Sequence, residues 1–349
     1  MRRRVVTPGI LLCGGDRRAV TKNYGFPNRH SIESAPRGEP LAAAAECVEG
    51  QMKRWIKWSL GAFAVALLLV LALALLGNQL AMHKMQRIVR LDVKAVPYQT
   101  DTQALQRGKY LFESRGCMEC HGANGGGREF VNDGKGLRFA GPNITPGGVT
   151  ASYQPQDWVR TIRHGVKPSG EPLMVMPSED FNRLTDQDLA AVVAYVRSLA
   201  PVSGGAAVLD LPLPVRVLYG FGAIKDSADK IDHSRPPAQP VAYGVNVEHG
   251  AYVANMCIGC HGEHLSGGKI PGGPPDWPPA ANITPGDGSA MSRYPGVAEF
   301  TAMLRSGKRP DGTSIKVMPF ETLGKLNDID AQAVYAFLKT VPARPAGGR

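Results

Sequence analysis

Cysteine is scarce in this sequence, and its placement is restricted. Six cysteines occur among 349 residues. Cys13 and Cys47 lie near the N-terminus, and the other four form two C-x-x-C pairs. Beyond Cys47, no thiolate outside these pairs is therefore available as a ligand. Cys13 and Cys47 are interpreted as incidental, with a reactive thiol as the alternative.

Two further signals are weak. No stretch has the apolar–polar alternation of a half-buried strand, which favours a mainly α-helical fold. The net charge is +10, but an Arg-rich N-terminal stretch inflates it. Nothing else in the sequence indicates a nucleic-acid surface, so no nucleic acid is expected as a partner.

Each C-x-x-C pair is followed directly by histidine. The motif C-x-x-C-H is typical of covalent c-type haem attachment, in which both thiols form thioethers and the histidine binds the iron. The sequence therefore predicts two covalently bound haem c groups. The expected attachment residues are Cys117, Cys120, Cys257 and Cys260, and the expected proximal iron ligands are His121 and His261.

Other uses of C-x-x-C remain as alternatives. A thioredoxin-like pair expects one motif in a βαβ setting, and none is visible. Structural zinc needs four ligands per site; pooling both motifs supplies four thiols but leaves both adjacent histidines unexplained. A disulfide within each C-x-x-C pair is the third alternative.

The sequence after the two motifs repeats. His261 follows His121 by 140 residues, and Asn143-Ile-Thr-Pro-Gly147 recurs 139 residues later as Asn282-Ile-Thr-Pro-Gly286. A repeat of this kind predicts two homologous modules of about a hundred residues, a normal size for a small domain. The expected modules are residues 97–201 and 243–342. Residues 202–242 are expected to form a strap over the module surface, because a structureless connection of that length is uncommon.

The dipeptide Met-Pro also recurs, and its methionine is the expected sixth iron ligand. Met176 and Met318 lie 55 and 57 residues after their proximal histidines. A thioether in this position raises the potential of haem iron and leaves no open coordination position. Met174 is a competitor, but Lys316 occupies the aligned position in the second module. His164 is a weaker competitor and is expected at the surface.

Helices are expected at matching places in the two modules. Residues 102–114 form the first helix of module 1, which leads into the cysteines. Middle helices are expected over 156–164 and 297–305. Closing helices are expected over 186–199 and 328–341, each with acidic residues in its first turn, as the helix dipole favours. Long Gly- and Pro-rich loops separate these segments.

These residues resemble the class I cytochrome c domain. The resemblance implies that the first and last helices of each module cross, with a glycine against an aromatic residue. By position these pairs are Gly108 with Tyr195, and Gly250 with Phe337. It also implies that a proline carbonyl, here Pro142, accepts a hydrogen bond from the proximal histidine. Module 2 has Ala281 at that position.

A narrower resemblance is to the membrane-bound cytochrome c subunits of bacterial alcohol and aldehyde dehydrogenases. It depends on the Asn-Ile-Thr-Pro segments, on Met-Pro-Ser and Met-Pro-Phe, and on the segment Asp210-Leu-Pro-Leu-Pro-Val-Arg216. Those subunits commonly carry three haems, whereas this chain has two motifs. The resemblance implies transfer of electrons between a periplasmic dehydrogenase and quinone or a terminal oxidase, without catalysis by this chain alone.

Alternative functions remain. A haem subunit of a cbb-type oxidase also has an anchor and two such modules. A peroxidase-like haem enzyme or a haem-based sensor would need an open or unusual iron site. A methionine in each module argues against both, and no output domain is visible for a sensor.

The N-terminal region predicts location. No charge occurs between Trp58 and Met82, and this stretch is long enough to cross a bilayer as a helix. Basic residues precede it, so the positive-inside rule predicts a single-pass anchor, residues 52–82, in the bacterial inner membrane with both modules in the periplasm. A cleaved signal peptide and a buried soluble helix are the alternatives. Residues 1–51 are expected to be disordered or to precede the true start at Met52.

Overall fold

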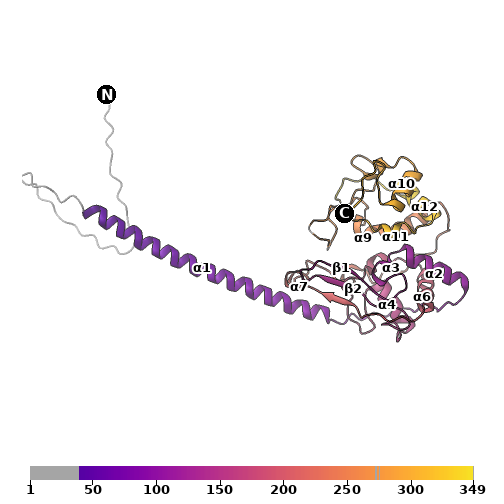
Figure 1. Ribbon diagram of the computed structural model, residues 1–349, viewed down its shortest axis with the longest axis horizontal. Helices are drawn as coiled ribbons and strands as arrows, with labels where there is room; N and C mark the ends of the chain where they lie inside the picture. Colours follow the sequence, from indigo (N-terminus) through magenta and orange to yellow (C-terminus); the bar gives the residue numbers. More distant parts are fainter. Residues whose placement is uncertain (1–38, 272, 275, 349) are drawn as a thin grey trace, which may run out of the picture. The chain divides into compact units, whose positions relative to one another are not determined.

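The computed structural model describes residues 39–271, 273–274 and 276–348, and the chain divides into two compact units, 1–73 and 74–349. Most of the predicted disordered segment, residues 1–38 with Cys13, lies outside the described residues. Both modules belong to the second unit (Figure 1).

The first element is the long helix α1 (Glu39–Met85). Its part Met52–Met85 is long and apolar enough to cross a membrane, by length and composition. Leucine, alanine and valine dominate this part, and most of their side chains are exposed. The helix is longer than the predicted anchor: it begins at Glu39, inside the segment expected to be disordered, and it ends at Met85.

Module 1 contains the expected helices, which are α2 (Thr102–Ser114), α4 (Pro155–His164) and α6 (Asp186–Ser198). Two short helices that were not predicted, α3 (Cys117–His121) and α5 (Ser178–Phe181), lie between them. Side-chain caps fix two of the starts: Asp101 accepts from the Ala104 amide at 2.9 Å, and Thr185 accepts from the Asp188 amide at 3.0 Å. The predicted mainly helical fold is confirmed.

Module 2 repeats this order. Its helices are α8 (Val247–Ala254), η2 (Asn255–Cys257), α9 (Ile258–His261), η3 (Ala290–Arg293), α10 (Val297–Ser306), α11 (Phe320–Leu323) and α12 (Asp328–Leu338). Figure 1 labels four of them, α9 to α12. Asn246 caps α8 and Asn327 caps α12, as Asp101 and Thr185 do in module 1.

The first and last helices of each module cross at a glycine. A Cβ on Gly108 would lie 2.0 Å from the Ala191 carbonyl oxygen and 2.8 Å from the Tyr195 Cβ. A Cβ on Gly250 would lie 2.0 Å from the Ala333 carbonyl oxygen and 2.8 Å from the Phe337 Cβ. Both expected glycine–aromatic contacts are confirmed, and no larger residue fits at either crossing.

A small sheet was not expected from the sequence. Strands β1 (Arg128–Asn132), β2 (Arg138–Gly141) and β3 (Val208–Asp210) form an antiparallel sheet in the order β1-β2-β3. The strands are short and partly exposed, so they have no long buried face that would require regular alternation. Through β3, the segment between the modules adds a strand to module 1.

The rest of that segment also has structure. Helix α7 (Leu213–Gly220) starts with Pro214 in its first turn, where proline is tolerated, and η1 (Ala228–Lys230) follows it. Tyr219 and Ala228 are buried. The Ser227 amide donates to the Leu173 carbonyl at 2.9 Å, so this segment is bound to module 1 beside Met176.

Candidate functional site

The predicted attachment cysteines lie on short helical turns. Helix α3 carries Cys117 and Cys120 three residues apart, which places them on one face of the turn. In module 2, Cys257 ends η2 and Cys260 lies in α9. None of the four is in a disulfide. In the described part of the chain, no three His, Cys, Asp or Glu residues converge on a metal-ion site, which argues against pooled zinc ligation.

Burial favours the neutral form of Cys117, Cys120 and Cys257. Burial raises the pKa of the Cys117 thiol to about 12 and that of Cys120 to about 11. Burial also raises the pKa of Cys257 to about 12. These thiols are therefore not reactive thiolates of the kind that a redox-active dithiol requires.

Both histidines of the motifs are oriented by a backbone carbonyl. The His121 Nδ1 lies 3.0 Å from the Pro142 oxygen, and the His261 Nδ1 lies 2.8 Å from the Ala281 oxygen. An Nδ1–H that donates to a carbonyl leaves the Nε2 lone pair free for a metal. Burial lowers the pKa of His121, which favours the neutral ring. The expected role of the Pro142 carbonyl is confirmed, and Ala281 serves equally because the backbone supplies the acceptor.

The two Met-Pro methionines lie against the cores of their modules. Met176 and Cys117 both pack on the cluster that contains Phe112, and Met318 and Cys257 both pack on the corresponding cluster of module 2. Met174 is not among the described residues that pack on either cluster. In module 1, the Ser227 hydroxyl also donates to the Met176 carbonyl, which ties this loop to the segment between the modules.

A buried donor without a partner tests whether haem fits module 1. The Trp158 side chain is buried in the cluster with Phe112, and its Nε1–H has no hydrogen-bond partner among the described residues. A buried polar group normally has one. Haem carries carboxylates that can accept this bond. The pattern of attachment cysteines, neutral histidine and unpaired indole therefore fits the group.

The Asn-Ile-Thr segments have a role that the repeat alone did not reveal. Buried Asn143 accepts from the Thr145 amide at 2.9 Å and donates to the Val202 carbonyl at 2.8 Å. Asn282 accepts from the Thr284 amide at 2.9 Å and donates to the Arg344 carbonyl at 2.8 Å. Each segment thus binds the histidine-side loop to the chain that follows the closing helix.

One expectation is wrong. His164 was expected at the surface, but it is only 9% exposed. Its Nδ1 lies 3.1 Å from the Nδ1 of His233, and burial lowers its pKa to about 4. The segment between the modules supplies His233 and covers His164, which no local sequence pattern predicts.

The two modules contact each other through reciprocal hydrogen bonds. The Tyr110 hydroxyl of α2 donates to Asp330 of α12 at 2.7 Å. The Tyr252 hydroxyl of α8 donates to Asp188 of α6 at 2.6 Å. Each aspartate also has a basic partner on its own module: Arg107 binds Asp188 and His249 binds Asp330.

One extra ion pair breaks the symmetry. Arg115 of module 1 reaches Asp330 at 2.7 Å, and both side chains are buried. Burial opposes the charge on Asp330, but Arg115 and the other donors outweigh it and hold its pKa below the usual range. Asn255, two residues before the second motif, stands where Arg115 stands before the first.

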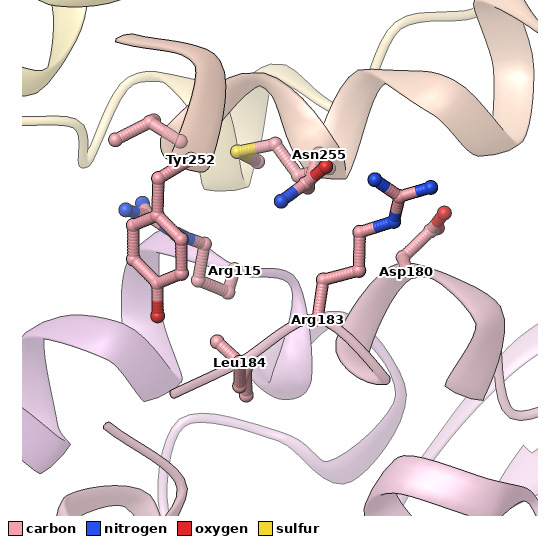
Figure 2. Close-up of a pocket in the computed structure, with 8 residues that line it drawn as sticks. Arg115, Asp180, Arg183, Leu184, Tyr252 and Asn255 are labelled. Atoms are coloured by element: carbon pink, nitrogen blue, oxygen red, sulfur yellow. The ribbon is translucent and has the colours of Figure 1, made fainter. Parts of the chain in front are cut away.

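The same interface brings the distal segment of one module to the haem motif of the other. A Cβ on Gly259 of α9 would lie 2.8 Å from an oxygen of Asp180 in α5. Helix α11 of module 2 likewise contacts α3 of module 1. Figure 2 shows Asp180 and Arg183 of module 1 together with Asn255 and Tyr252 of module 2 around a cavity of about 10 Å³, which is room for about one water.

Comparison with known proteins agrees with this geometry. The family "Cytochrome c" matches residues 105–200, and "Cytochrome C oxidase, cbb3-type, subunit III" matches residues 247–338. The fructose dehydrogenase cytochrome subunit of Gluconobacter japonicus is 26% identical over 280 residues, which cover 72% of this chain and 56% of that protein.

Two further relatives have similar coverage of this chain. The gluconate 2-dehydrogenase cytochrome c subunit of Pantoea cypripedii is 26% identical over 71% of this chain and 62% of its own length. A diheme cytochrome c-type protein of Cereibacter sphaeroides is 27% identical over 69% of this chain and 87% of its own length. The matched part of this chain therefore spans less than two thirds of the length of the fructose dehydrogenase and gluconate 2-dehydrogenase subunits. It is an electron-transfer protein of two cytochrome c domains with two covalently bound haem c groups, and it is similar to the cytochrome c subunits of bacterial dehydrogenases.

Proposed function

We propose that this chain is the membrane-anchored dihaem subunit that carries electrons between a periplasmic dehydrogenase and the respiratory chain, where quinone or a terminal oxidase is its partner. Two of its relatives are named as cytochrome subunits of sugar or sugar-acid dehydrogenases, which supports a partner of that class. The chain alone then has no catalytic residue, because its task is to hold and tune two redox groups.

The residues of each module have distinct roles in this proposal. Bound haem supplies a reversible one-electron couple. The thiols of Cys117 and Cys120, and of Cys257 and Cys260, hold the group covalently. The carbonyls of Pro142 and Ala281 keep each histidine Nδ1–H engaged, so that Nε2 of His121 or His261 would be free to bind the haem iron.

The methionines complete the ligand sets. Met176 and Met318 pack on the same clusters as Cys117 and Cys257, which supports their assignment as the sixth ligands that the haem irons would take. A soft thioether raises the potential and fills the sixth position, which suits electron transfer and not substrate binding. Each methionine precedes the proline at the N-cap of the next short helix, α5 or α11.

The observation that carries the proposal is the interface between the modules. Asp180 lies against Gly259 within the second C-x-x-C-H motif, and α11 lies against α3. The reciprocal bonds of Tyr110 and Tyr252 hold this arrangement. Such an interface keeps the two cofactor-binding motifs close, as a chain that relays electrons requires, whereas two independent binding modules would need no fixed contact.

The apolar part of α1, Met52–Met85, is assigned to the bacterial inner membrane as a single-pass anchor. Lys53, Arg54 and Lys57 precede its uncharged stretch, which by the positive-inside rule puts the start of the helix in the cytoplasm and the modules in the periplasm. This location also suits an electron carrier that serves membrane-bound partners.

Purification of the native membrane complex tests the proposal. A pyridine haemochrome assay is expected to give two haems c per chain, and the haem is expected to remain on the denatured polypeptide. A dehydrogenase flavoprotein or quinoprotein is expected to co-purify, and its substrate is expected to reduce both haems. Haem that extracts with acid acetone, or iron sites that bind carbon monoxide readily, would contradict the proposal and favour a haem enzyme or sensor.

A cbb-type terminal oxidase is the second candidate. The match of residues 247–338 to the cbb3-type subunit III family favours it for module 2. Co-purification separates the two: an oxidase complex would contain a copper- and haem-containing catalytic subunit and would consume oxygen without an added dehydrogenase substrate.

A further inference from the structure

The end of α1 and helix α7 approach each other closely. A Cβ on Gly220 would lie 2.0 Å from the Gly77 carbonyl oxygen and 3.0 Å from the Ala81 amide nitrogen. A Cβ on Gly77 would lie 2.8 Å from the Phe221 ring. Gly77 and Ala81 are buried and four residues apart, a spacing of small residues that lets two helices touch at the backbone. Helix α7 is therefore fixed on the last turns of α1.

A charged cluster follows directly and locks this contact. Arg87 binds Asp226 through both carboxylate oxygens, at 2.5 and 2.8 Å, and binds Asp229 at 2.7 Å. The Lys84 ammonium lies 2.8 Å from Asp229 and 4.6 Å from the ring centre of Tyr219. These contacts pair the basic residues that follow the apolar stretch of α1 with the acidic residues that follow α7. They therefore hold α7 against α1.

Three apolar side chains of α7 and of the residue that follows it are about half exposed. Leu213, Leu218 and Phe221 are 46%, 48% and 50% exposed. Leu75, Leu76 and Leu80, on the last turns of α1, are exposed as well. An apolar surface of this kind, next to a charged cluster, is typical of a segment that lies at the boundary of a membrane.

We infer that α7 is a second membrane contact, and that Leu213, Leu218 and Phe221 enter the interfacial layer of the lipid bilayer. The inference rests on the proposed anchor. Trp58 to Gly77 is 20 residues, about the number that a helix needs to cross the hydrocarbon core. Gly77, on which Gly220 and Phe221 pack, thus falls at the outer boundary of that core, directly after the exposed Leu75 and Leu76 of α1. Lipid, and not a soluble partner, is the occupant because the surface continues that of the spanning helix.

The contact has a consequence for module 1. Ser227, between Asp226 and η1, hydrogen-bonds the carbonyls of Leu173 and Met176. Val89 donates to the Gly170 carbonyl at 2.8 Å. The chain after α1 and the chain after α7 thus both bind the distal loop of module 1. Seating α7 in the bilayer would therefore fix the side of module 1 that faces the membrane, whereas one spanning helix alone would let the module rotate.

Spin labels on the full-length holoprotein in phospholipid vesicles test the inference. Leu218→Cys and Phe221→Cys are made with Cys13 and Cys47 replaced by serine, and two haems per chain are verified for each variant. The measured quantity is the ratio of the collision rates of the label with oxygen, which concentrates in lipid, and with a water-soluble nickel chelate. Leu68→Cys, in the uncharged stretch, reports the anchor, and Val245→Cys, an exposed apolar position of module 2, reports water.

The ratio at positions 218 and 221 is expected to exceed that at Val245 and to approach that at Leu68. A water-like ratio at 218 and 221, with a lipid-like ratio at Leu68, would overturn the inference and leave the anchor intact. Low collision rates with both reagents at 218 and 221 would also overturn it, because a protein partner or a second copy would then cover the surface. A water-like ratio at Leu68 would instead refute the anchor itself.

Discussion

The hydroxyl of Tyr110 donates to the carboxylate of Asp330 across the interface between the modules, at 2.7 Å. Tyr110→Phe removes this bond without changing the shape of the side chain. The interface is expected to lose about 1.5–3 kcal/mol, the usual contribution of a hydrogen bond to a charged group. Chemical denaturation of the holoprotein measures the loss. Tyr98→Phe is the control, because the Tyr98 hydroxyl is exposed and its hydrogen bond to the Tyr153 carbonyl is long, at 3.4 Å. Equal effects of the two changes would contradict the assignment.

Arg115→Ala is a stronger test of the same interface. It leaves buried Asp330 with one charge partner fewer, and loss of one member of a buried pair costs about 3–5 kcal/mol. The exposed pair of Arg128 and Glu321 also joins the modules and provides the control. Arg128→Ala is expected to cost about 0–1 kcal/mol. A reversed order in denaturation experiments would show that Arg115 does not stabilise the interface.

Replacement of either Met-Pro methionine is expected to change one iron only. Met176→Ala or Met318→Ala removes the thioether, so the potential of that haem falls and the weak red-end absorption band of Met–iron coordination drops by about half. Redox titration and visible spectroscopy measure both effects. Met174→Ala is the control, since Met174 does not pack on the core cluster. If Met174→Ala removes the band component and Met176→Ala spares it, the assignment of the distal ligand in module 1 is wrong.

The hydrogen bonds of the buried Asn143 amide are expected to contribute to the stability of module 1. Asn143→Ala leaves the Val202 carbonyl and the Thr145 amide without their partner, at a cost of about 1–3 kcal/mol. The loop that carries the Pro142 carbonyl is then expected to loosen, which lowers thermal stability of the holoprotein in calorimetry. Asn132→Ala changes an exposed amide and is expected to have little effect. No loss of stability in Asn143→Ala would refute the role given to this motif.

The buried carboxyl group of Asp180 is expected to make the stability of the folded protein depend on pH. Burial raises its pKa to about 7, with Glu179 adding to the shift and Lys230 opposing it. The folded protein therefore holds a proton that the unfolded chain releases at lower pH. The contribution to stability is complete below the ordinary pKa near 3.8 and is lost as the pH rises through about 7.

Asp180→Asn is expected to remove this loss. Melting temperatures of the holoprotein at pH 5 and pH 8 measure it: the variant should gain relative to the native protein at pH 8. Asp276→Asn, an exposed carboxylate, serves as the control and should leave the pH dependence unchanged. The same slope in native protein and Asp180→Asn would exclude Asp180 as the group responsible.

The sequence predicted what is repeated and local. The helices α2, α4 and α6 follow from helical spacing and from caps such as Thr185, and the crossing at Gly108 follows from the family resemblance. The contacts of His164 and Tyr110 did not follow, because their partners lie 69 and 220 residues away. The short strands were not predicted for a related reason, because β3 is defined by its pairing with β2, which is distant in the sequence.

The reciprocal bonds between the modules have the form of an isologous contact. Residue Tyr110 reaches Asp330 as its counterpart Tyr252 reaches Asp188, which is the relation that a two-fold axis imposes between identical subunits. Each module carries both halves, a tyrosine on its first helix and an aspartate on its last. One module by itself is therefore self-complementary, and the tandem chain satisfies within one polypeptide a contact that separate copies would satisfy by pairing.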